Sequence, residues 1–211
     1  MKSALLIANG EVTASEIKKI RDEQFDLIVA ADGGALAAQK YGYDPDYVIG
    51  DFDSLTPQAK LKLPKTQFIL RPSQELNDLE KTLKFCERKK VAQITILGAC
   101  GKRLDHTLNN LSVLARYDQT FKLNIYDAYS QIFLVRDQFT CYGEPGQLIS
   151  LIPSGTVEGV TTEGLAFPLK NEPLIFGQRE GLSNYIVSNP VNVTLKSGLL
   201  FVFVIEGNAS F

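Results

Sequence analysis

Two aspartates at alternate positions, Asp51 and Asp53, are well suited to hold a divalent cation. They follow a short apolar run at 47–49 that is typical of a strand, and in extended backbone side chains two residues apart point the same way, roughly 7 Å from each other. One cation or its water shell can bridge carboxylates at that distance. The flanking Gly50 and Ser54 are also typical of an ordinary polar turn, which is the alternative interpretation of this segment.

A second polar cluster occupies residues 98–106 and combines glycines with basic side chains. Its glycines allow close approach to the backbone, and Lys102 and Arg103 can bind phosphate oxygens, Arg103 in a bidentate manner. Asp105 and His106 then open a helix. His106 is the only histidine of the chain, so it lacks the companions of a zinc site, and it can serve either as a structural cap or as a functional group.

Two glycine turns follow the first apolar runs. Asn9 and Gly10 come after the run at 3–8, and an Asp32-Gly-Gly turn comes after the run at 26–31. Backbone N–H groups at the start of a helix can bind phosphate. The glycines can equally serve only the tight turns.

Acidic and amide groups crowd the expected start of a helix at 77–90. Helix capping explains Asn77 and Asp78 without any function, because carboxylates are favoured at a helix N-terminus. The functional alternative is that Asp78 faces the same cleft as Asp51 and Asp53 and completes a metal site.

The elements that must position these clusters alternate between short apolar runs and helical segments up to about residue 128. In an open parallel α/β sheet, ligands bind in the crevice at the carboxyl ends of the strands. Because the polar clusters recur after the strands, they are expected to meet in one site. Three carboxylates with a basic pair indicate phosphoryl chemistry assisted by Mg²⁺.

The pattern changes after residue 128, where short β-rich runs are separated by glycine-containing turns with little helical periodicity. The sequence therefore predicts a mostly parallel, Rossmann-like α/β domain at 1–128, followed by a small all-β sandwich or flattened barrel at 129–211. In the second domain, a polar Gly-Leu-Ser-Asn stretch at 181–184 interrupts the apolar runs. Phe201 is most simply a core residue.

Composition narrows the class of protein. A formal net charge of −2 gives no general attraction to nucleic acid or to an anionic membrane. No apolar run is long enough for a membrane span, and the first ten residues lack the core of a signal peptide, so a cytoplasmic protein is expected. The three cysteines are widely spaced and predict neither a disulfide framework nor a zinc site.

The motifs together resemble those of thiamine pyrophosphokinases, in the same order and over nearly the whole chain. They are D-G-G at 32–34, G-D-F-D-S at 50–54, E-x-N-D at 75–78, G-x-x-G-x-R-x-D-H at 98–106 and G-L-S-N at 181–184. The resemblance implies an enzyme that uses ATP and Mg²⁺ to move a diphosphate onto the hydroxyl of thiamine, giving thiamine diphosphate and AMP. It also implies a homodimer whose substrate site lies between the α/β domain of one subunit and the β domain of the other.

The resemblance also implies functional roles for individual residues of this chain. It implies a metal site made of Asp51, Asp53 and Asp78. Catalytic roles fall on these three aspartates and on Arg103 and Asp105. The nucleotide side of the cleft is implied to hold Asn9, Gly10, Asp32, Gly33, Gly34, Arg103 and His106. Thiamine contacts are implied for Ser183, Asn184 and Phe201. The E-x-N-D motif at 75–78 departs from the Asp-x-Thr-Asp that is usual in this family, because it has Glu75 and Asn77. Glu75 is therefore left out of the expected metal site.

The implied mechanism is in-line attack of the thiamine hydroxyl on the β-phosphorus of ATP, with AMP as the leaving group. The general base is left open between one of the three aspartates and His106. The alternatives are a diphosphokinase for another small alcohol such as a pterin, and a non-catalytic module that senses nucleotides. A phosphatase with an aspartyl nucleophile is disfavoured, since its Asp-x-Asp pair is expected after the first strand and here follows the third.

Overall fold

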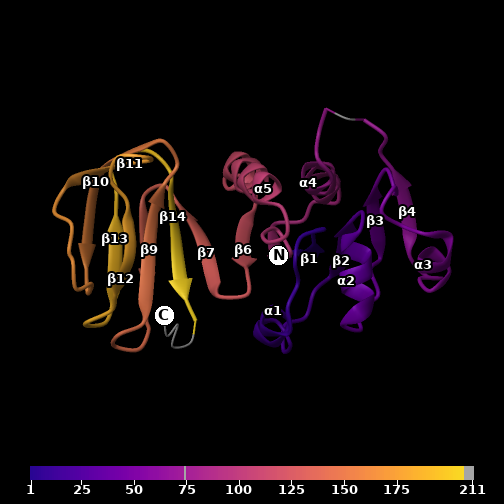
Figure 1. The fold of residues 1–211 in the computed structure, drawn as a ribbon, viewed down its shortest axis with the longest axis horizontal. Coiled ribbons are helices and arrows are strands. Elements are labelled where there is room, and N and C mark those ends of the chain that lie inside the picture. Colours follow the sequence, from indigo (N-terminus) through magenta and orange to yellow (C-terminus); the bar gives the residue numbers. More distant parts are fainter. Residues whose placement is uncertain (74, 207–211) are drawn as a thin grey trace. The chain divides into compact units, whose positions relative to one another are not determined.

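In a computed structural model of the protein, residues 1–73 and 75–206 are described (Figure 1). The chain divides into two units, Met1–Ala128 and Tyr129–Phe211. The last five residues of the predicted second domain lie outside the described residues. Each unit is considered by itself.

The first unit is built on a parallel sheet with strand order β6-β5-β1-β2-β3-β4. The strands are β1 (Ser3–Ile7), β2 (Leu27–Ala31), β3 (Tyr47–Gly50), β4 (Gln67–Leu70), β5 (Gln93–Leu97) and β6 (Lys122–Tyr126). The chain runs from β1 to β4 on one side of the sheet and then crosses to β5 and β6 on the other side of β1. This reversal of strand order creates a crevice at the carboxyl ends of the strands, where such sheets bind ligands.

Helices connect the strands of the first unit. They are α1 (Ala14–Lys19), α2 (Gly34–Lys40), α3 (Pro57–Leu61), α4 (Asp78–Arg88) and α5 (Leu104–Tyr117). Figure 1 shows α4 and α5 next to each other; α4 packs on β2 and β3, and α2 packs on β1 and β2. Because helices cover the sheet, β1, β2 and β5 are buried along nearly their whole length, and β1 and β2 are almost entirely apolar.

Local sequence signals fix where several of these helices begin. Thr13 and Glu16 form a capping box at the start of α1. Thr56 caps α3, with Pro57 as its first residue, and the Asn77 side chain caps α4 by accepting a hydrogen bond from the Glu80 N–H. The start of α4, which carries Asp78, is therefore set by its own sequence.

The second unit is an antiparallel β-sandwich. One sheet has the order β12-β9-β14-β7 and the other the order β11-β10-β13-β8. Their bounds are β7 (Ser130–Val135), β8 (Gln138–Cys141), β9 (Leu148–Pro153), β10 (Thr156–Glu163), β11 (Glu172–Ile175), β12 (Gly181–Tyr185), β13 (Val191–Thr194) and β14 (Leu200–Ile205). Buried side chains of both sheets share one core. The expected fold class, α/β followed by all-β, is confirmed.

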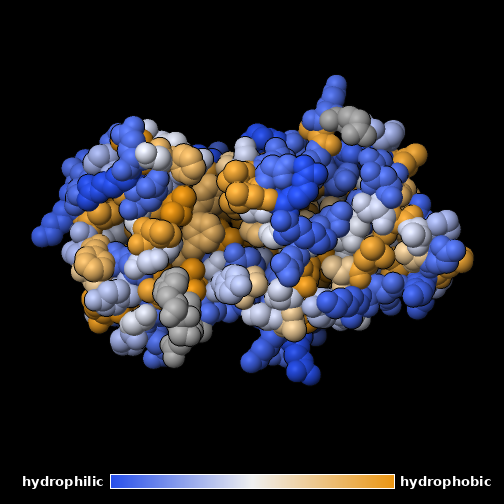
Figure 2. All heavy atoms as spheres, in the orientation of Figure 1, coloured by the Kyte–Doolittle hydropathy of each residue, from blue (hydrophilic) through white to orange (hydrophobic). Residues whose placement is uncertain are grey.

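Large apolar side chains remain exposed on the second unit. They include Tyr142, Phe167, Phe176, Leu182 and Val187. Figure 2 shows hydrophobic side chains exposed among hydrophilic ones on the viewed face. Contiguous exposed apolar surface commonly marks a binding site, whereas single exposed apolar residues are ordinary.

The three cysteines are free thiols. Burial raises the pKa of Cys86 and of Cys100 to about 12, so both are neutral near pH 7. Among the helices of the described residues, none has the length and apolar character needed to cross a lipid bilayer.

Candidate functional site

A cleft of about 420 Å³ opens in the first unit at the carboxyl ends of β1, β3 and β5. Loops after these strands line it together with the first turns of α4 and α5. Its polar lining consists of Asn9, Asp51, Asp53, Asn77, Asp78, Lys81, Lys102, Arg103, His106 and Asn110. The fold thus brings together polar clusters that lie up to about a hundred residues apart in the sequence, as the parallel sheet predicted.

Three carboxyl groups converge in this region, those of Asp32, Asp51 and Asp78. Each offers one oxygen atom, and these oxygens all lie within 4.8 Å of one another. Asp32 follows β2 and is 1% exposed, and its buried Oδ1 has no hydrogen-bond partner among the residues that the structure describes. Buried polar atoms are almost always bonded, so an unpartnered carboxylate oxygen beside two further carboxylates is suited to a hard cation such as Mg²⁺.

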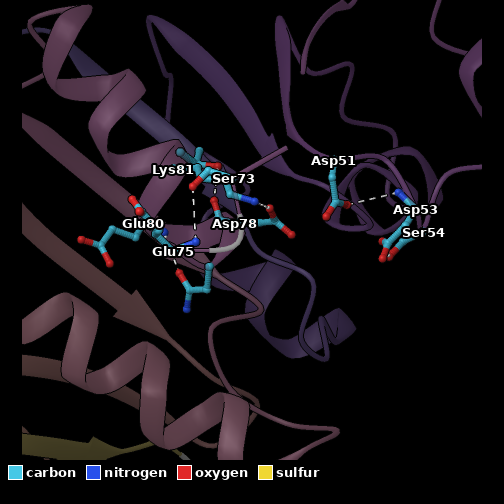
Figure 3. Close-up of polar contacts among 10 residues, drawn as sticks. Asp51, Asp53, Ser54, Ser73, Glu75, Asp78, Glu80 and Lys81 are labelled. Carbon is cyan, nitrogen blue, oxygen red and sulfur yellow. Dashed lines mark hydrogen bonds and ion pairs between the residues drawn. The ribbon is translucent and has the colours of Figure 1, made fainter. Parts of the chain in front are cut away.

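Asp53 is not a member of this carboxylate group, although it lines the cleft. The sequence predicted that Asp51 and Asp53 would project together from extended backbone, and that geometry is wrong. Phe52 adopts a left-handed conformation with φ of 67°, and the Asp53 N–H donates a hydrogen bond to Asp51 Oδ1 over 3.3 Å (Figure 3). The chain therefore turns directly after β3, and alternation of side chains ends at Gly50.

Asp32 is the third member of the carboxylate group because β2 and β3 are neighbours in the sheet. The Asp32 N–H donates to the Ile49 carbonyl over 2.9 Å, which holds the two strand ends together. A Cβ atom on Gly50 would meet Asp32 Cβ at 2.8 Å. Only glycine at position 50 permits this approach, so the first residue of the G-D-F-D-S motif has a packing role toward Asp32.

Asp78 reaches the group from the start of α4. Burial is the main cause that raises its pKa; Asp32 and Asp51 also raise it, and a hydrogen bond from Lys81 opposes them. Lys81 Nζ lies 2.9 Å from Asp78 Oδ1 (Figure 3). Sequence reasoning missed Lys81, although its position three residues after Asp78 on a helix was the available signal.

The glycine turns bring backbone segments into close contact. A Cβ atom built on Gly10 would lie 2.2 Å from the Gly98 carbonyl oxygen, and one built on Gly34 would lie 2.1 Å from the Ile7 carbonyl oxygen. A Cβ atom built on Gly33 would lie 2.4 Å from Asn9 Oδ1. The Gly10 N–H also donates to the Gly98 carbonyl over 2.8 Å. Packing against backbone therefore requires glycine at positions 10 and 34, whereas the contact at Gly33 is with the end of the Asn9 side chain.

The basic residues after β5 differ in their surroundings. Lys102 Nζ donates to the Asn9 carbonyl over 2.9 Å, which ties two walls of the cleft together. Arg103 forms an exposed bidentate pair with Asp105, and this pairing lowers the pKa of Asp105 to about 2. Asp105 was expected in the cleft but is not among its lining residues, whereas Arg103 and His106 are.

The three predicted thiamine contacts lie in the second unit. Ser183 is exposed and left-handed, with φ of 55°. Asn184 is buried; its Oδ1 accepts hydrogen bonds from the Phe167 and Tyr185 N–H groups, and its Nδ2 donates to the Phe167 carbonyl over 2.8 Å. Phe201 is 7% exposed in β14, between β7 and β9. The Asn184 side chain is occupied by hydrogen bonds to backbone groups. Phe201 alternates along β14 with Leu200 and Val202, which belong to the sandwich core, so its side chain lies on the opposite face of the strand.

Comparison with known proteins completes this description. Residues 21–126 match the family model "Thiamin pyrophosphokinase, catalytic domain", and residues 138–200 match "Thiamin pyrophosphokinase, vitamin B1 binding domain". The chain belongs to the thiamin pyrophosphokinase family. The resemblance expected from the motifs is thereby confirmed, and the two models fall on the two units.

Individual thiamin pyrophosphokinases are similar over nearly their full length. Thiamine pyrophosphokinase of Bacillus subtilis is 25% identical over 96% of this chain and 98% of its own length. Thiamin pyrophosphokinase 1 of Caenorhabditis elegans is 26% identical, over 97% and 90% of the two chains. Among solved structures, that of the Bacillus subtilis enzyme superposes with a TM-score of 0.84 at 24% identity, covering 97% of this chain and 99% of that one. The Candida albicans structure gives 0.82 at 20% identity, covering 97% and 89%.

Proposed function

We propose that this member of the thiamin pyrophosphokinase family transfers the diphosphate of ATP to the hydroxyl of thiamine, giving thiamine diphosphate and AMP. The observation that carries the proposal is the cleft of the first unit, which is lined by Asp51 and Asp78 of the carboxylate group and by Lys102 and Arg103. Carboxylates that hold a divalent cation, opposite basic groups that bind phosphate, are the parts that phosphoryl transfer needs. The match to both family models supports thiamine as the acceptor.

The residues present fit Mg²⁺. The carboxylate group supplies only oxygen ligands, and the unpartnered Oδ1 of Asp32 is a buried acceptor that a cation would satisfy. Asp32, Asp51 and Asp78 would hold the ion, in place of the set of Asp51, Asp53 and Asp78 predicted from the sequence. When bound there, Mg²⁺ neutralises charge on the phosphate oxygens.

The remaining cleft residues orient the reactants. Arg103 and Lys102 would donate to phosphate oxygens and stabilise the charge that develops as AMP leaves. Asn9, Gly10 and His106 would line the nucleotide side. Because three aspartates serve the cation, we assign Asp53 as the acceptor of the thiamine hydroxyl proton. Most of the acceleration would then come from positioning and electrostatics.

The second unit would bind thiamine. We propose that Asn184 acts indirectly, since its side chain holds the backbone of Phe167. The rings of Phe167 and Tyr185 meet edge to face with centroids 5.9 Å apart, and both residues are exposed. They offer an exposed aromatic face, whereas Phe201 is 7% exposed. The exposed apolar residues of this unit also support a homodimer in which each second unit serves a shared substrate site.

Acceptor dependence tests this function. Purified protein is incubated with ATP, Mg²⁺ and either thiamine, a pterin alcohol or no acceptor, and AMP is resolved from ADP. The proposal predicts AMP and thiamine diphosphate with thiamine alone. AMP formation with the pterin only would reassign the acceptor, and ATP binding without turnover on any alcohol would favour the nucleotide-sensing module.

A further inference from the structure

Lys81 is a buried lysine that lines the cleft. Its side chain is 5% exposed, whereas lysines are almost never buried unless paired. An ammonium group has three N–H donors. Among the residues that the structure describes, Lys81 Nζ donates one hydrogen bond, to Asp78 Oδ1 over 2.9 Å. Donor capacity therefore remains for a molecule that enters the cleft.

The charge around Lys81 indicates what such a molecule is. When the carboxylate group of Asp32, Asp51 and Asp78 holds one divalent cation, a single negative charge is left over, and the ammonium of Lys81 cancels it. Cancelling that charge reduces the repulsion of an incoming polyphosphate, although Asp53 also lines the cleft. Without Lys81, the loaded site would keep a negative charge on the side where the phosphates must approach.

An ion pair with Asp78 alone is a weaker explanation for a buried lysine at position 81. A buried ion pair seldom adds stability over apolar residues of similar size, and this pair lies at the wall of a cleft instead of inside the core. The lysine ammonium is a compact charge with rotatable donors, so it can bond a carboxylate and a phosphate at the same time.

We infer that Lys81 is a phosphate-binding residue of the transfer site, held in place by Asp78, and that its free N–H groups bind oxygens of the β- and γ-phosphates of ATP. This inference rests on the proposed function, because it assumes that the polyphosphate chain lies beside the carboxylate group.

The test compares Lys81→Gln with Lys84→Gln, which removes a lysine from the same helix but outside the cleft. Glutamine keeps a donor for Asp78 and removes the charge. Binding of α,β-methylene-ATP and of AMP is titrated calorimetrically with Mg²⁺ present. Lys81→Gln should weaken binding of the analogue roughly 10- to 100-fold, the effect of a lost charge-assisted hydrogen bond. AMP, which lacks the two transferred phosphates, should bind each variant as it binds the wild type.

Unchanged affinity for the analogue, or an equal loss for AMP, would overturn the inference. A measurement on the wild type covers the case in which Lys81→Gln does not fold. The Nζ resonance of Lys81 in nitrogen-labelled protein should shift when the Mg²⁺ complex of the analogue is added and stay in place with AMP; no shift with the analogue refutes the contact. Failure of the proposed function is distinguishable, because wild-type protein would then bind the analogue yet form no thiamine diphosphate.

Discussion

Replacing Asp32 with asparagine should stabilise the protein in the absence of divalent cations. At an effective dielectric constant near 20, two charges at the 4.8 Å that is the upper limit of these oxygen–oxygen distances repel by roughly 3 kcal/mol. Removing Asp32 relieves its repulsion with both Asp51 and Asp78, and Lys81 already offsets part of that energy. We therefore expect a net gain of about 1–2 kcal/mol, or about 2–8 °C in Tm for a chain of this size. The backbone should tolerate the change, because asparagine readily adopts the φ of 41° found at Asp32.

The same substitution should remove most of the response to cations. Wild-type protein should be stabilised as Mg²⁺ or Mn²⁺ is added, since a ligand that binds only the folded state raises Tm with concentration. Loss of one of three carboxylates should weaken Mn²⁺ binding roughly 10- to 100-fold. Melting curves in EDTA and along a cation titration measure both effects.

Asp53→Asn is the matched control, because Asp53 lines the same cleft but lies outside the carboxylate group. It should leave Mn²⁺ affinity within about threefold of wild type, as expected where no direct ligand is lost. The reasoning is refuted if Asp53→Asn abolishes the cation response while Asp32→Asn retains it. That result would restore the metal set predicted from the sequence.

Three further outcomes are expected. Asn184→Ala should lower the free energy of unfolding in urea by about 2–4 kcal/mol, because three backbone partners lose their bonds; unchanged stability would mean that the amide is available to a ligand. Cys100, whose pKa burial raises to about 12, should react with iodoacetamide at pH 8 far more slowly in the native protein than in urea, and equal rates would contradict its burial. Burial raises the pKa of Glu16 above 4.5, so its contribution to stability is fully present below pH 4.5 and is lost as pH rises through the folded-state pKa. Glu16→Gln should lack that loss, and parallel pH–stability curves for the two proteins would refute the assignment.

Much of the fold could be predicted because it depends on patterns that the sequence displays directly. Apolar runs without polar alternation mark strands covered on both faces, and the helices between them require parallel order. Caps such as Thr13, Thr56 and Asn77 are local signals. The site could be predicted to lie at the strand ends because topology, more than any single residue, decides where the polar clusters meet.

The details of the site depend on features that the sequence does not display. A left-handed conformation at Phe52 is uncommon for a bulky residue, so the extended alternation of Asp51 and Asp53 was the natural expectation. The contribution of Asp32 requires β2 and β3 to be neighbours in register. Lys81 was missed because lysine is normally exposed. A thiamine contact of Asn184 was implied by the resemblance of the G-L-S-N stretch, and its hydrogen bond with Phe167, seventeen residues away, has no local signal in the sequence.

The most direct test of the proposed reaction follows the terminal phosphate of ATP. Protein, Mg²⁺ and thiamine are incubated with ATP radiolabelled at the γ-phosphate, and the products are separated. Transfer of the diphosphate in one step predicts label in thiamine diphosphate, one equivalent of unlabelled AMP, and neither ADP nor labelled inorganic phosphate. Label in thiamine monophosphate together with ADP would contradict attack at the β-phosphorus and with it the central claim.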